Sequence, residues 1–173
     1  ALFMRRLGLP ADVPDQGTGA KESKSFLARV LTHEEVRRLL EAADQIVPMA
    51  STHLRHLVLP ELLRVLYGCG LRLEEALSLR MRDVDLVQGV LHINDTKFRK
   101  DRLVPPARPL VVRLQKYAAA LGPRADDDYF FPSPRGGRLD GGGVYRNYRE
   151  LLHRSGIGHG GRGEGPRLHD LRH

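Results

Sequence analysis

Residues 67–79 read Tyr-Gly-Cys-Gly-Leu-Arg-Leu-Glu-Glu-Ala-Leu-Ser-Leu, the end of one helix and the start of another. The two glycines stop the first helix, because glycine readily adopts the left-handed conformation in which many helices end. The second helix is expected over residues 72–79. Its start would place Arg72 beside exposed backbone N–H groups, where a guanidinium fork can hold two phosphate oxygens. The alternative is a surface arginine that only pairs with Glu75, three residues on.

The sequence before this stretch predicts two helices. Thr32 and Glu35 have the spacing of a capping box, and apolar residues follow them at helical intervals. An apolar run at residues 62–66 predicts a second helix, with Pro60 near its start or at a kink. Residues 1–30 include a mixed polar segment without a sustained period, so we expect a linker or an N-terminal arm there.

After residue 79 the apolar period changes to that of strands. Alternation over Val90–Asp95, a polar turn and a second run at Arg102–Pro105 predict a β-hairpin. A basic cluster lies around the turn and consists of Lys97, Arg99, Lys100 and Arg102. Such a cluster can contact a phosphate backbone, although a solvated turn protected by its charges from edge pairing is the alternative. Further on, a helix is expected over Val144–Leu152.

The C-terminal residues 166–173 read Pro-Arg-Leu-His-Asp-Leu-Arg-His. They predict the start of a helix with His169, Arg172 and His173 on one face. Two histidines four residues apart also suggest zinc, but no glutamate follows His169 and the cation of Arg172 would repel a metal ion. We therefore expect no metal site.

Taken together, these motifs resemble the tyrosine recombinases, or phage integrases. The core of that family carries a Gly-Leu-Arg-x-x-Glu helix start, a lysine on a β-hairpin and a His-x-Leu-Arg-His box, and all three occur here in that order. The resemblance covers about residues 31–173, which we interpret as one catalytic domain. The expected fold is α+β, a mainly helical core with a small antiparallel β-sheet, in which Arg72, His169 and Arg172 converge.

The resemblance also implies catalytic roles. Arg72 and Arg172 would be the two arginines that neutralise charge on the non-bridging oxygens of a phosphodiester without giving up a proton. Lys97 would be the general acid for the departing 5′ oxygen, and His169 would assist proton transfer to or from the nucleophile.

Other residues would support this site. Glu75 would brace Arg72, and His173 would close the box in a structural role. The remaining cations of the hairpin are expected to contact DNA; they are Arg99, Lys100 and Arg102.

The nucleophile of the family is a tyrosine that follows the box. All five tyrosines of this sequence precede it: Tyr67, Tyr117, Tyr129, Tyr145 and Tyr148. The domain is therefore expected to be C-terminally incomplete, so that these residues bind DNA without cleaving it, while the intact protein forms a 3′-phosphotyrosyl link. The family also usually has a helical domain that closes around DNA, and residues 1–30 are too short to supply one.

Composition agrees with a DNA partner. The net charge is +7, and all of it lies in the second half of the sequence, where residues 87–173 hold 16 basic and 9 acidic side chains. A single cysteine cannot form an internal disulfide, and no apolar segment is long enough for a signal sequence or a membrane span. We expect a cytoplasmic protein that acts on double-stranded DNA with other protomers, as a tetramer when intact, without a cofactor, a membrane or a small-molecule substrate.

Two other functions remain possible on this sequence. One is a non-catalytic DNA-binding module or regulator derived from an integrase, which would keep the basic groove. The other is a metal hydrolase built on His169 and His173.

Overall fold

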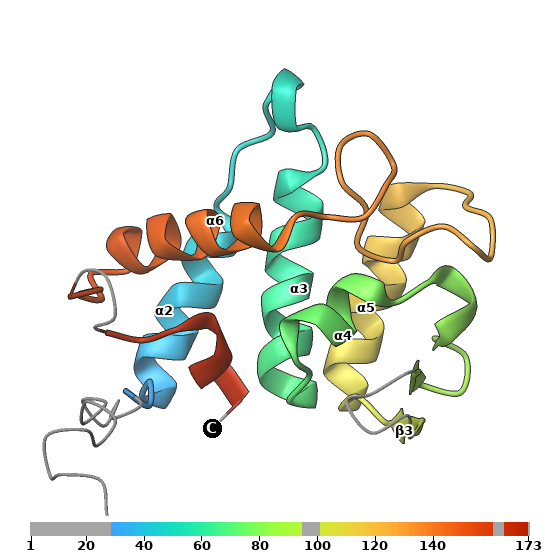
Figure 1. Cartoon of the computed structure of the whole chain (residues 1–173), viewed down its shortest axis with the longest axis horizontal. Helices are drawn as coiled ribbons and strands as arrows, with labels where there is room; N and C mark the ends of the chain where they lie inside the picture. The colour runs from blue at the N-terminus through green and yellow to red at the C-terminus, as the bar shows by residue number, and fades with distance from the viewer. Residues whose placement is uncertain (1–28, 95–100, 161–164, 173) are drawn as a thin grey trace, which may run out of the picture.

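The computed structural model describes residues 29–94, 101–160 and 165–172 (Figure 1). The α-helices in these ranges are α2 (His33–Asp44), α3 (Arg55–Cys69), α4 (Leu73–Ser78), α5 (Arg108–Leu121) and α6 (Gly141–Arg154). The 3₁₀ helices are η2 (Ala50–Thr52), η3 (Met81–Asp83) and η4 (Leu168–Arg172). The strands are β1 (Val84–Asp85), β2 (Val90–Ile93) and β3 (Arg102–Val104). None of these helices is long and apolar enough to cross a bilayer. The predicted mainly helical α+β fold is confirmed.

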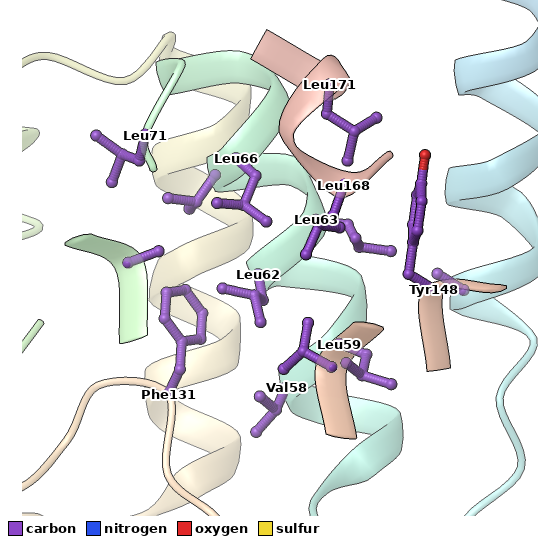
Figure 2. Packing of buried hydrophobic residues seen from close by; sticks show 14 of the residues in the cluster. Val58, Leu59, Leu62, Leu63, Leu66, Leu71, Phe131, Tyr148, Leu168 and Leu171 are labelled. Carbon is purple, nitrogen blue, oxygen red and sulfur yellow. The ribbon is translucent and has the colours of Figure 1, made fainter. Parts of the chain in front are cut away.

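Helix α3 forms the centre of the core. Its buried apolar side chains are Val58, Leu59, Leu62, Leu63, Val65 and Leu66. A helix that is apolar around most of its surface must be covered on several sides, and α2, α5, α4 and η4 all pack against it (Figures 1 and 2). Pro60 lies inside the second turn of α3, and the helix ends at Gly70, whose φ of 61° is left-handed. The sequence predicted Pro60 near the start and the end at Gly70, but Gly68, which was also expected to stop the helix, lies inside α3.

The helices that flank α3 begin at capping residues. The Thr32 hydroxyl accepts a hydrogen bond from the Glu35 N–H, and the Glu35 carboxylate accepts one from the Thr32 N–H, so the predicted capping box is present. Helix α6 begins at Gly141, three residues before the predicted Val144, because the Asp140 carboxylate accepts a hydrogen bond from the Gly143 N–H. The predicted start at Val144 left the three glycines that follow Asp140 outside the helix, but this cap fixes them in it.

Salt bridges join α2, α3 and α5. Glu61 of α3 is 7% exposed and accepts hydrogen bonds from Arg113 of α5. Arg113 also bonds Asp44 at the end of α2, and Asp44 pairs with Arg64 of α3. A buried carboxylate is tolerated only when its charge is paired, so these contacts hold the three helices in one arrangement.

The sheet contains the predicted hairpin with one extra strand. The order is β1-β2-β3, all antiparallel, and β2 pairs with β3 in the register Leu91↔Val104, His92↔Leu103 and Ile93↔Arg102. The strands are shorter than the predicted Val90–Asp95 and Arg102–Pro105, and Pro105 lies just past β3 because proline cannot donate a ladder hydrogen bond. Strand β1 has only two residues, too few for an alternating pattern.

The helix predicted to start in the C-terminal segment is present as the 3₁₀ helix η4. Leu168 and Leu171 are buried on the side of α3 that carries Leu63 (Figure 2). The Asp170 carboxylate accepts hydrogen bonds from the backbone N–H and the guanidinium of Arg167. These anchors turn the segment after only a few residues, which favours the tighter 3₁₀ winding.

Candidate active site

Arg72 is the last residue before α4. Its backbone is extended, with φ −71° and ψ 150°, and the helix begins at the next residue. Leu71 before it is fully buried, as are Ala76 and Leu77 on the inner face of α4. These contacts fix the helix on the core while the Arg72 side chain stays 45% exposed. The site therefore presents a guanidinium at the start of a helix whose position is set by buried apolar groups.

Glu75 binds Arg72 and a second arginine. Its carboxylate accepts hydrogen bonds from the backbone N–H of Arg72 at 2.8 Å and from the Arg72 guanidinium at 2.9 Å. It also accepts two from the guanidinium of Arg102 on β3, at 3.1 and 2.7 Å. The Glu75 side chain is 8% exposed. The four donors satisfy a carboxylate that water scarcely reaches.

These contacts keep Glu75 ionised. Burial by itself would raise the pKa of the Glu75 carboxyl, but the hydrogen bonds from Arg102 and Arg72 outweigh it and lower the pKa to about 2. The charge on Glu75 therefore persists at every pH at which a DNA enzyme works, and the orientation of Arg72 does not depend on pH in that range.

Helix η4 carries the two box residues that the structure describes, His169 and Arg172. Asp170 between them is 1% exposed, and its bonds to Arg167 fix the start of the helix. Burial would raise the pKa of Asp170, but the hydrogen bonds from Arg167 lower it, so this carboxyl is ionised. The Arg172 side chain is half-buried, and its Nε has no hydrogen-bond partner among the described residues. An unpaired buried N–H is costly and is often found at functional sites.

One pocket joins the start of α4 to η4. It has a volume of about 250 Å³, and its lining residues are Leu71, Leu73, Tyr145, Arg167, Leu168 and His169. The two residues on either side of Arg72 thus share a pocket with His169. Segments far apart in the sequence meet here because both pack against the C-terminal half of α3 (Figure 2).

A second, larger cavity lies on the other side of Arg72. It has a volume of about 650 Å³ and lies between α4, η3 and β2. Arg72 and Glu75 line it together with Arg80, Arg82 and His92. Ile93 and Asn94, at the end of β2, also line it. The residues predicted at the hairpin turn, Lys97, Arg99 and Lys100, lie outside the described residues, as does His173.

Comparison with known proteins gives the family. The model of the phage integrase family matches residues 29–173. The chain belongs to the phage integrase family. The predicted resemblance to tyrosine recombinases is thereby confirmed, and the fold agrees with it.

Named relatives of this integrase domain are recombinases. It is 38% identical over 148 residues to the putative integrase/recombinase y4rE of Sinorhizobium fredii, covering 84% of this chain and 46% of the relative. It is 33% identical over 135 residues to the tyrosine recombinase XerA of Pyrococcus furiosus, covering 76% and 43%. The chain thus spans about half the length of the relatives that it matches.

Solved structures agree with the fold. A crystal structure of a XerA recombinase matches with a TM-score of 0.68 and 30% identity, over 99% of this chain and 55% of that one. The lambda integrase catalytic core, 21% identical, has a TM-score of 0.61 over 83% of this chain and 78% of that one, and this second likeness shows the fold alone.

The tyrosines of the integrase domain are held by structural contacts. Tyr117 and Tyr148 are buried; the Tyr117 hydroxyl donates to the Phe130 carbonyl, and burial raises the pKa of both phenols. The Tyr67 hydroxyl bonds His33, and Tyr129 lies beneath the Arg80 guanidinium. Tyr145 differs from these four, because it lines the pocket that contains His169.

Sequence reasoning missed three residues of this integrase site. Arg102 was expected to contact DNA, yet its guanidinium lies on Glu75. Asp170 was given no role, yet it is nearly fully buried and accepts hydrogen bonds from Arg167. Tyr145 lines the pocket of His169 without having been assigned to it. The Arg167–Asp170 spacing was a usable signal, since residues three apart meet on a helical turn.

Proposed function

We propose that this chain is the catalytic domain of a cytoplasmic, site-specific DNA recombinase, which cleaves and rejoins DNA strands through a 3′-phosphotyrosyl link in the intact protein. Its substrate is double-stranded DNA, and its partners are further recombinase protomers that act as a tetramer. The nucleophilic tyrosine lies outside these 173 residues. Neither a metal nor a small-molecule cofactor takes part.

The observation that carries this proposal is the arrangement around Arg72. The guanidinium of Arg72 is half-exposed and bound to Glu75, and its neighbours Leu71 and Leu73 share a pocket with His169 from the far end of the sequence. A related structure supports DNA as the partner, because XerH recombinase was solved bound to its difH substrate. That structure matches this chain with 25% identity and a TM-score of 0.64, over 84% of this chain and 41% of that one. No feature of the described residues favours a second function as strongly.

The chemistry follows from the side chains. The tyrosine oxygen attacks phosphorus and its proton passes to His169, while Arg72 and Arg172 neutralise the charge that builds on the non-bridging oxygens. The bond from phosphorus to the 5′ oxygen then breaks, and Lys97 supplies the proton that this oxygen takes up. Arginine suits the first task because it does not lose its proton, and lysine suits the second because it can.

The first prediction concerns covalent attachment. The 173-residue chain, mixed with a nicked suicide substrate, should give no protein–DNA band that survives denaturation, because Arg72, Lys97, His169 and Arg172 cannot replace a nucleophile. The same chain extended by its native downstream coding sequence should give such a band. The measurement is a denaturing gel with end-labelled DNA.

Tyr145→Phe is the control for this experiment, because Tyr145 is the tyrosine of this chain that lines the pocket of His169. A band from the 173-residue chain that disappears in Tyr145→Phe would identify an internal nucleophile and overturn the mapping. If neither the 173-residue chain nor the extended chain gives a band, a non-catalytic DNA-binding module is favoured.

The second prediction concerns salt. Binding of a DNA duplex by this chain should be weak and largely independent of sequence, because the excess charge lies in residues 87–173 and acts through phosphates. With about three phosphate contacts, affinity should fall about 40-fold between roughly 50 and 200 mM monovalent salt. Fluorescence anisotropy at several salt concentrations gives the slope. Affinity that does not change with salt would contradict a phosphate-dominated interface.

A further inference from the structure

We propose that Arg102 is a positioning residue of the active site, which holds Arg72 in place through Glu75, and not a contact to DNA. This inference rests on the proposed function, since its consequence for catalysis appears in strand cleavage. It also makes a claim about Glu75 that can be measured on this chain without DNA.

The geometry of Arg102 is that of a fixed ion pair. Its two terminal nitrogens donate to the two oxygens of the Glu75 carboxylate, at 3.1 and 2.7 Å. Paired bonds of this kind fix both groups in a plane and are the strongest that arginine forms with a carboxylate. The same two oxygens accept the bonds from Arg72. Arg102 therefore determines the position of the carboxylate to which Arg72 is bound.

The burial of Glu75 argues against a contact between Arg102 and DNA. The Arg102 side chain is 36% exposed, whereas that of Glu75 is 8% exposed. For Arg102 to reach a DNA phosphate, it would leave this carboxylate without two of its four donors. Leaving a buried charge partly unpaired is unfavourable, so the guanidinium stays on Glu75.

Strand pairing extends this link to the hairpin. Arg102 is the first residue of β3 and pairs in register with Ile93 at the end of β2. Lys97 lies between these two strands in the sequence. The contact between Arg102 and Glu75 thus ties the base of the hairpin to the start of α4. One carboxylate, that of Glu75, thus binds both Arg72 and the first residue of β3.

Cleavage by two Arg102 variants distinguishes a positioning role from a contact to DNA, because one variant keeps the positive charge and the other removes it. Arg102→Lys keeps the cation but cannot form the paired bonds, and Arg102→Met removes the cation. In the intact protein, both variants should cleave a suicide substrate about 100-fold more slowly in single turnover, because a small displacement of a catalytic group has an effect of this size. Their DNA affinity and salt slope should equal those of the wild type.

Arg108→Met, at an exposed arginine at the start of α5, is the matched control and should behave as the wild type.

The opposite pattern would overturn the inference. If Arg102 contacts DNA, Arg102→Lys should cleave normally, while Arg102→Met should weaken binding and lower the salt slope by about one. Normal cleavage by both variants would also overturn it. If the wild-type protein itself fails to cleave, the proposed function is wrong, and the inference is then decided by the measurement that follows.

The DNA-free measurement is the titration of Glu75 in this chain by carboxyl ¹³C NMR. The pKa of Glu75, about 2 in the wild type, should rise in Arg102→Met and stay unchanged in Arg108→Met. The Arg72 Nε–H bond should become more mobile in both Arg102 variants, as measured by ¹⁵N relaxation of its resonance. Arg102→Lys retains a cation near the carboxylate and so remains informative if Arg102→Met folds poorly. An unchanged Glu75 pKa in folded Arg102→Met, or an unchanged Arg72 signal, would overturn the inference.

Discussion

Arg72→Ala in the intact protein should slow DNA cleavage by about 10²–10³-fold while changing DNA affinity by only a few fold. The effect on rate is large because this guanidinium acts on charge that exists mainly in the transition state. The effect on binding is small because one phosphate contact among several is lost. Single-turnover cleavage of a suicide substrate and anisotropy on the same duplex measure the two quantities.

The control for this prediction is Arg72→Lys, which keeps the charge and loses the fork. It should also cleave slowly, because a compact ammonium cannot bind two oxygens and the Glu75 carboxylate at once. Arg149→Ala, at an exposed arginine of α6 away from Glu75, should cleave at the wild-type rate. Equal losses of binding and of cleavage in Arg72→Ala would mean that Arg72 only anchors the backbone.

The second large effect is on stability. Leu62→Ala should lower the free energy of unfolding of this chain by about 3 kcal/mol, because Leu62 is fully buried at the centre of α3 and truncation leaves a cavity. Figure 2 shows Leu62 between the helix and Phe131, within the largest group of buried side chains. Urea denaturation followed by circular dichroism measures the change.

The same substitution at an exposed site serves as its control. Leu103 on β3 is 64% exposed, so Leu103→Ala should change the free energy of unfolding by about 0.5 kcal/mol or less. Similar losses at both positions would show that α3 is not the centre of the core.

Much of the fold could be predicted because its signals are local. The capping box at Thr32, the left-handed Gly70 and the proline that follows β3 each act within a few residues, so the sequence contains their whole cause. The errors have a different origin. Helix α6 starts early through one side-chain cap, and η4 is wound tightly by leucines that bind a distant helix. The cap of α6 is local but falls on glycines that carry no apolar period, and the contacts of η4 with α3 are tertiary and leave no periodic pattern.

The candidate site could be predicted only in pieces. Arg72 and Glu75 are three residues apart, so their pairing follows from helical spacing. The approach of His169 to the start of α4 follows from how both pack on α3, which no local rule gives. The pairing of Arg102 with Glu75 could not be predicted, because a cation beside other cations resembles a DNA contact and only the register of β3 shows which carboxylate it reaches. The catalytic, supporting and DNA-binding roles of all these site residues stay predictions, as does the division of the chain near residue 30.

The anchoring of η4 has a mechanical consequence. His169 and Arg172 occupy one five-residue helix, which two leucines and the Arg167–Asp170 pair hold against α3. The two residues proposed for proton transfer and for charge stabilisation are therefore held by the same short helix. A shift of that helix along α3 would displace both at once, so the box cannot lose one function by movement and keep the other. Its few anchors also make its opening less costly than unfolding of the core, so His169 and Arg172 can lose their positions while the core stays folded.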